Sequence, residues 1–143
     1  MNLNNFTIKG QESVQRAQQL AMERDNPSIE AGHLLKGVLE VDESVTPFVF
    51  KKMSVNLVNL EKALDSIIQG YPKASGGSGQ YLSRTAAEAL QKANTYLKTF
   101  EDEYVAIEHI LLGILSVKDS VSQMLKDSGV NEKDLVQIGR AHV

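Results

Sequence analysis

The sequence predicts an all-α domain made of two tandem four-helix repeats that are related by a pseudo-twofold axis. Three observations support this fold class. The 143-residue chain has 42% hydrophobic residues, only 6% aromatic residues and no Trp, a composition that favours helices over sheets. Apolar residues recur at the three- and four-residue spacing of helices. The second half of the chain also repeats the first half.

The internal repeat appears when the chain is shifted against itself by 76 residues. Residues 6–45 then align with residues 82–121 without a gap, and ten of the forty pairs are identical. An average composition would give roughly two or three identities by chance. The alignment therefore indicates a duplication. The identical pairs include Glu12/Glu88, Gln15/Gln91, His33/His109 and Gly37/Gly113.

Capping residues and apolar spacing place the first two helices. Thr7 is a candidate N-cap, and the residues after it form an apolar stripe made of Val14, Ala17, Leu20 and Ala21. The segment around Pro27 then breaks the helix. Ser28 is the candidate cap of a second helix, which is expected to end at about Val41.

The third and fourth helices of the first repeat follow from similar signals. Ser44 is the candidate cap of a short third helix. A fourth helix is expected over Asn56–Gln69, where Gly70 supplies the stop. The second repeat starts again at Ser83, and Gly129 is expected to end its third helix.

The segment between the repeats, residues 71–80, is rich in Gly and Ser, and this composition predicts a flexible connector. Each half of the chain has only about 70 residues, a size at which an isolated core is marginal. We therefore expect one domain over residues 1–143, with repeats at about 6–70 and 81–137 packed together. Residues 138–143 match the translation of a common sequencing-adapter sequence and are therefore expected to be a non-native tail.

Charge and composition exclude several function classes. The formal net charge is −3 with acids and bases interspersed, which leaves no basic stripe for nucleic acid. The absence of Cys excludes thiolate metal sites and Cys nucleophiles. The N-terminal residues lack a signal-peptide pattern, and the apolar stretch over residues 110–115 is far too short for a membrane span. We expect a cytoplasmic protein without nucleic-acid or membrane partners.

Two segments of the chain resemble a known family. Residues 29–39, with sequence IEAGHLLKGVL, and residues 105–115, with sequence VAIEHILLGIL, are similar to the two repeats of Clp N-terminal domains. The similarity extends from Met1 to about Gln137. The segment Tyr81–Arg84 after the Gly-rich connector resembles the ClpB branch of the family. The resemblance implies the all-α Clp N-domain fold.

The resemblance also implies a function in protein disaggregation. Such domains precede the ATPase ring of AAA+ unfoldases, and in ClpB they engage exposed apolar segments of unfolded or aggregated polypeptides, in work shared with the DnaK system. The full-length parent protein that contains such a domain is implied to be a homohexamer, and the isolated domain is implied to be a monomer. The Gly-rich segment 76–79 lacks the Lys of a phosphate-binding loop. We therefore expect a non-catalytic binding domain without a cofactor.

By position, the resemblance assigns the rim of a client-binding groove to five residues: Thr7, Lys92, Tyr96, Glu108 and His109. The family often has an aliphatic residue where Lys92 stands, which implies a narrower or more polar groove here. Tyr96 suits this role because its ring is apolar and its hydroxyl is polar. Thr7 as an N-cap and Tyr96 as an ordinary half-buried aromatic are the structural alternatives.

The repeated ionisable residues have structural interpretations. A metal site at His33 and His109 would need a third ligand, which the sequence does not supply. We expect each imidazole to be partly buried and hydrogen-bonded to the backbone or to a hydroxyl. The repeated Glu12 and Glu88 could act in acid–base chemistry, but repeat symmetry favours solvated helix faces.

Two alternative functions stay open. One is the adaptor- or phosphoarginine-binding N-domain of a ClpC- or ClpA-type unfoldase. In the phosphoarginine readers a Glu precedes the His in both repeats, whereas here Glu108 is present and Gly32 stands at the other position. The other alternative is a free-standing enzyme or helical regulator, but no nucleophile, base and orienting residue are assembled by the sequence.

Overall fold

The first repeat contains four helices and one short strand. The computed structural model describes residues 2–74 and 81–142. In chain order the elements of this repeat are α1 (Ile8–Glu23), β1 (Ser28–Ile29), α2 (Ala31–Val41), α3 (Val45–Lys52) and α4 (Leu57–Gln69).

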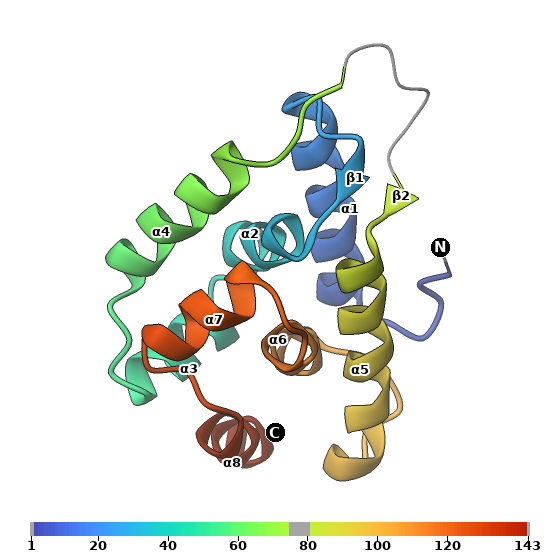
Figure 1. Cartoon of the computed structure of the whole chain (residues 1–143). Helices are drawn as coiled ribbons and strands as arrows, with labels where there is room; N and C mark the ends of the chain where they lie inside the picture. The colour runs from blue at the N-terminus through green and yellow to red at the C-terminus, as the bar shows by residue number, and fades with distance from the viewer. Residues whose placement is uncertain (1, 75–80, 143) are drawn as a thin grey trace.

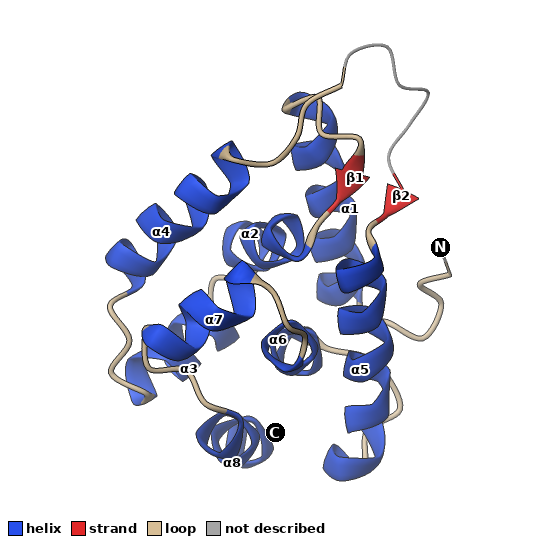
Figure 2. Cartoon of the chain, in the orientation of Figure 1, coloured by secondary structure: helices blue, strands red, loops and turns tan. Residues whose placement is uncertain are grey.

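The second repeat has the same order of elements (Figure 1). They are β2 (Tyr81–Leu82), α5 (Arg84–Phe100), α6 (Ile107–Ser116), α7 (Ser120–Asp127) and α8 (Glu132–His142). In the part of the chain that the structure describes, the two strands are only two residues long (Figure 2). The prediction of an all-α fold with two four-helix repeats is confirmed.

The predicted N-caps of the first helix of each repeat are confirmed. The Thr7 hydroxyl accepts a hydrogen bond from the Gly10 N–H at 3.0 Å, and the Ser83 hydroxyl accepts one from the Ala86 N–H at 3.1 Å. These bonds satisfy backbone donors that have no partner inside the helix. The prediction for Ser28 is wrong, because this residue lies in β1 and α2 begins three residues later, with Glu30 at its N-cap.

The N-terminus of α3 is capped by Asp42 rather than by the side chain of Ser44. The buried Asp42 carboxylate accepts hydrogen bonds from the N–H groups of Ser44, Val45 and Thr46, and from the Thr46 hydroxyl at 2.7 Å. Burial alone would raise the pKa of Asp42, but these bonds to the charged form outweigh it and lower the pKa.

Two short parallel pairings join the repeats in a reciprocal way. Ile29 of β1 pairs with Leu82 of β2, and Phe6 forms a bridge with Val105. Under the 76-residue shift, Phe6 corresponds to Leu82 and Ile29 corresponds to Val105. The two pairings are therefore the same contact made in both directions, each between one repeat and the other.

The same symmetry holds for the hydrogen bonds beside these pairings. The Thr7 N–H donates to the Val105 carbonyl at 2.9 Å, and the Ser83 N–H donates to the Ile29 carbonyl at 3.0 Å. The start of the first helix of each repeat is thus attached to the segment that precedes the second helix of the other repeat. The sequence does not reveal these strands, because two residues are too few for an alternating pattern.

The hydrophobic core lies along α2 and α6. Each is apolar over most of its length, and one cluster of buried side chains runs through both repeats. In Figure 1, α6 lies among α5, α7 and α8, and α2 lies between α1 and α4. The fully buried side chains of these two helices include Leu34, Leu35, Ile110, Leu111, Leu112 and Ile114.

The first part of the predicted connector is packed on the first repeat. The Tyr71 hydroxyl accepts a hydrogen bond from the Gly32 N–H at 3.2 Å, and the Ala74 N–H donates to the Asp25 carbonyl at 2.9 Å. Burial raises the pKa of the Tyr71 hydroxyl, which therefore stays protonated. Residues 75–80 of the predicted connector lie outside the described part of the chain.

One glycine in each repeat allows two helices to pack closely. A Cβ atom added to Gly37 of α2 would clash with the Ser13 carbonyl of α1, and one added to Gly113 of α6 would clash with the Ala89 carbonyl of α5. The two pairs correspond under the 76-residue shift. The identity of Gly37 and Gly113 is thus explained by helix packing.

The substitution Gly113→Ala should destabilise the domain, because the new methyl group meets backbone that cannot move independently of α5. We expect the free energy of unfolding in urea to fall by roughly 1–3 kcal/mol. Gly70→Ala is the matched control, since the nearest atom to its added Cβ is the Ile67 carbonyl oxygen at 3.5 Å. An equal loss in both variants would contradict the close packing of α5 and α6.

Candidate functional site

A surface hollow of about 540 Å³ lies between α5, α6 and the segment that joins α7 to α8. Its floor is apolar and its rim is polar. We call it the α5–α6 groove. The floor consists of Tyr96, Leu112, Leu115 and Val130, and the rim consists of Lys92, Ser116, Lys126, Asn131 and Glu132.

The floor of the α5–α6 groove is shallow. Tyr96 is 8% exposed and Leu112 only 1%, because these side chains also belong to the core. The Tyr96 hydroxyl donates a hydrogen bond of 2.8 Å to Glu132 Oε1, which attaches the start of α8 to α5. Burial and then the bonded Glu132 carboxylate raise the pKa of Tyr96 to about 12. The hydroxyl is therefore a neutral donor at physiological pH.

A second hollow, of about 570 Å³, adjoins the first and shares Lys92 and Ser116 with it. We call it the basic hollow, because it has three cationic side chains and one carboxylate. Its lining residues are Arg84, Thr85, Glu88, Lys92, Ser116, Val117 and Lys118. The two adjacent hollows, with Lys92 and Ser116 at their boundary, are together called the depression; one part has an apolar floor and the other part is basic.

Of the five site residues predicted from the sequence, the structure brings Lys92 and Tyr96 together in the α5–α6 groove. Glu108 is half-buried in the first turn of α6, one turn before Leu112 of the floor. Its Cβ lies close to α8, because a Cβ added to Gly139 would be 3.6 Å from it.

Thr7 and His109 do not line the α5–α6 groove. Thr7 is half-buried and caps α1 beside Val105. His109 has no exposed surface. Its ring lies beneath the surface, where Nδ1 accepts a hydrogen bond from the Ala106 N–H just before α6.

The two repeated histidines have the same hydrogen-bond arrangement. In each, Nδ1 accepts from a backbone N–H, that of Glu30 at 2.9 Å for His33 and that of Ala106 at 2.8 Å for His109. The neutral ring therefore carries its proton on Nε2. The Nε2–H of His33 donates to the Asn26 amide oxygen at 2.8 Å.

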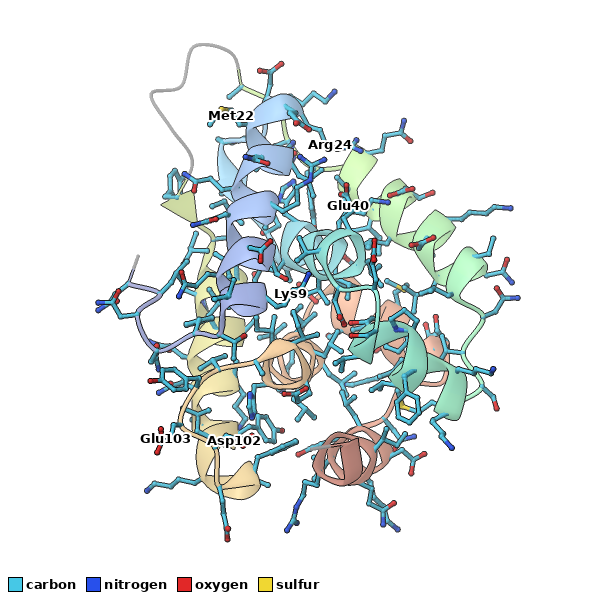
Figure 3. All side chains as sticks on the ribbon, turned by 180° about the vertical axis from the view of Figure 1, so that it is seen from behind. Lys9, Met22, Arg24, Glu40, Asp102 and Glu103 are labelled. Carbon is cyan, nitrogen blue, oxygen red and sulfur yellow. The ribbon has the colours of Figure 1, made fainter. Side chains whose placement is uncertain are left out.

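In the second repeat the partner of Nε2 is a carboxylate. His109 Nε2 lies 3.0 Å from Asp102 Oδ2, in the turn after α5 that Figure 3 labels. Burial lowers the pKa of both rings, that of His33 to about 4. For His109 the Asp102 carboxylate opposes this effect, because it favours the imidazolium. The predicted bond to the backbone is present in both rings, but the rings are fully buried and their Nε2 partners are an amide and a carboxylate rather than a hydroxyl.

Several groove residues were not predicted from the sequence, notably Leu112, Leu115, Lys126 and Glu132. Leu112 follows Glu108 by four residues, so helical spacing could have placed it on the same face. Glu132 carries no comparable signal, because its contact with Tyr96 depends on how α8 packs.

No helix within residues 2–74 and 81–142 is long and apolar enough to cross a membrane. No group of three or more His, Cys, Asp and Glu side chains in the same ranges could hold a metal ion.

Residues 5–128 match the Clp repeat (R) N-terminal domain family. This match covers most of the chain and both repeats. The chain belongs to this family. The Clp N-terminal domain fold accounts for the repeated four-helix arrangement.

Among curated proteins, the chain is similar to the chaperone protein ClpB of Bacteroides thetaiotaomicron, with 50% identity over 135 residues. The match covers 94% of this chain and 16% of that protein, so this Clp N-terminal domain spans about one sixth of its relative. The homologues support a ClpB-type chaperone N-domain.

Solved structures share the fold at lower identity. The Hsp104 N-terminal domain from Candida albicans has a TM-score of 0.82 at 21% identity, over 94% of this chain and 89% of that one. A complex of the ClpV N-domain with a VipB peptide has a TM-score of 0.76 at 17% identity, over 96% and 93% of the two chains.

The histidine contacts predict a shift in one pKa. Asp102→Asn replaces the carboxylate at His109 Nε2 with an amide, which reproduces the environment of His33. The pKa of His109 should fall, because the imidazolium loses its charged partner. An NMR titration of the ring protons measures it, with His33 as the internal control. A rise in the pKa of His109 would contradict the contact.

His33 itself predicts a dependence of stability on pH. Its pKa of about 4 lies below the unfolded value of about 6.5, so the unfolded state binds the proton first. The contribution of neutral His33 should be complete above pH 6.5 and should decrease as the pH falls toward 4. Urea unfolding across this window measures it, and His33→Gln should show a smaller change over the same range.

Proposed function

We propose that this Clp N-terminal domain is the substrate-recognition domain of a ClpB-type ATP-dependent disaggregase and binds exposed apolar segments of unfolded or aggregated polypeptides. The observation that carries the proposal is the α5–α6 groove, in which an apolar floor is surrounded by polar side chains. Apolar side chains of a client would lie on the floor, and the rim would contact its backbone. Polypeptide binding by this fold also has a parallel in the complex of the ClpV N-domain with the VipB peptide.

Weak binding follows from the shallow floor. A contact that buries ~400 Å² of apolar surface gains on the order of 10 kcal/mol. Association costs of roughly 4–15 kcal/mol offset most of this gain, which leaves an affinity of about micromolar or weaker. Weak binding suits a domain that samples many clients, because several copies in one assembly raise the total affinity.

The proposal extends to the parent protein. The ClpB relative is about six times longer than the matched region, which leaves room for ATPase modules outside this chain. We propose a homohexameric parent that works with the DnaK system, in which this domain binds clients and performs no catalysis. The reciprocal pairings through Phe6–Val105 and Ile29–Leu82 support a single domain over residues 1–143.

The phosphoarginine-binding alternative is less well supported by the first repeat. Gly32 stands where a phosphoarginine reader has a Glu, and the Tyr71 hydroxyl lies over Gly32, where a Cβ would have no room. A carboxylate therefore could not be introduced there without moving Tyr71. In the second repeat, Glu108 lies close to Gly139 of α8.

A variant with a filled groove tests the proposal. Ser116 is exposed on the rim, so Ser116→Trp should place an indole over the floor without removing a core side chain. We expect binding of reduced, carboxymethylated α-lactalbumin to weaken at least about tenfold. An NMR titration measures the affinity. In the domain without the substitution, the chemical-shift changes should cluster at Lys92, Tyr96 and Leu112.

Ser66→Trp, which adds the same side chain on the exposed face of α4, is the matched control and should bind normally. Normal binding by Ser116→Trp, or shifts confined to the first repeat, would argue against the groove. Free phosphoarginine is titrated in the same way, and tight binding near Glu108 would favour the alternative function.

A further inference from the structure

A cationic side chain at equivalent positions of the two repeats has ion-pair partners in the first repeat but not in the described part of the second. In the first repeat, Arg16 of α1 forms ion pairs with Glu40 of α2 at 3.2 Å and with Glu23 at 3.3 Å. Figure 3 labels Glu40 on α2, beside α1. The 76-residue shift places Lys92 at the position of Arg16. The cation is therefore kept in the second repeat.

The carboxylate partners are not kept. The shift places Ser116 at the position of Glu40, and Thr99 at that of Glu23. Lys92 is exposed, and none of the described residues offers it a carboxylate within ion-pair distance. An unpaired Lys92 thus stands at the junction of the α5–α6 groove and the basic hollow.

Two further lysines enlarge this positive region. Lys126 lies on the rim of the α5–α6 groove, and Lys118 lines the basic hollow. Both are exposed, and neither has an ion-pair partner among the residues that the structure describes. Lys118 stands at the position of Asp42 in the first repeat, and the carboxylate that caps the following helix is provided in the second repeat by the neighbouring Asp119.

Two carboxylates line the depression, against the four cationic side chains of Arg84, Lys92, Lys118 and Lys126. Glu88 pairs with Arg84 at 3.1 Å, and Glu132 accepts the hydrogen bond of Tyr96. Lys92, Lys118 and Lys126 therefore leave a local excess of positive charge on a chain whose formal net charge is −3. Charge complementarity then determines which polypeptide segments bind to these two hollows most tightly.

We propose that the α5–α6 groove and the basic hollow together select polypeptide segments in which an apolar side chain is flanked by acidic residues. This inference rests on the proposed function and adds a client preference to it. The apolar side chain lies on the floor beside Tyr96, and the neighbouring carboxylates contact Lys92 and Lys118 or Lys126. Long-range attraction also brings acidic segments to this face and away from the rest of the acidic surface.

Three labelled peptides test the preference. They share one apolar core and are flanked by Asp, by Ser or by Lys, and their binding is measured by fluorescence anisotropy. The Asp-flanked peptide should bind about three- to tenfold more tightly than the Ser-flanked peptide, because each exposed charge contact is weak. The Lys-flanked peptide should bind most weakly. The differences should shrink as the NaCl concentration rises.

The double variant Lys92→Gln/Lys126→Gln should remove most of the preference and retain binding of the Ser-flanked peptide. Lys51→Gln/Lys62→Gln is the matched control, since it removes the same charge from α3 and α4 and should keep the preference. Equal binding of the three peptides, or tighter binding of the Lys-flanked peptide, would overturn the inference and leave the proposed function standing. Failure of all three peptides to bind would overturn both.

Discussion

Two backbone hydrogen bonds, one from Thr7 to Val105 and one from Ser83 to Ile29, fix how the repeats face each other. Each joins the start of one repeat's first helix to the segment before the other repeat's second helix. Because backbone groups make these bonds, substitutions of side chains need not disturb them. The close approach of helices at Gly37 and Gly113 then brings α2 and α6 into the core. The α5–α6 groove takes its position from this frame.

On this common frame, the repeats differ at their surfaces. The buried imidazoles keep the same backbone contact, while the partner of Nε2 is Asn26 in one repeat and Asp102 in the other. Arg16 is paired with two carboxylates, whereas Lys92 is left with none among the described residues. Interior positions are constrained by packing, but surface charge can change at little cost in stability. Within the described part of the chain, the second repeat thereby carries unpaired positive charge at the position where the first repeat has ion pairs.

The sequence predicts most of this fold because its signals are local and periodic. The apolar spacing of α1, the caps Thr7 and Ser83, and the repeated Gly37 and Gly113 each report a contact that the structure contains. The cap Asp42 was not predicted because it lies two residues before the N-cap position Ser44 and binds the first N–H groups of α3 from outside the helix. The strands were missed because their partners lie more than fifty residues away along the chain.

The candidate site was harder to predict than the fold. Lys92 and Tyr96 were predicted only through resemblance to a family, and the place of Glu132 in the groove depends on the packing of α8.

The reciprocal pairings of Phe6 with Val105 and of Ile29 with Leu82 also determine what happens when the chain is divided. A chain cut between residues 74 and 81 would leave two fragments, each carrying half of both pairings, so neither could complete its contacts alone. Such fragments should reassociate noncovalently when mixed, which makes this domain a natural scaffold for a split reporter.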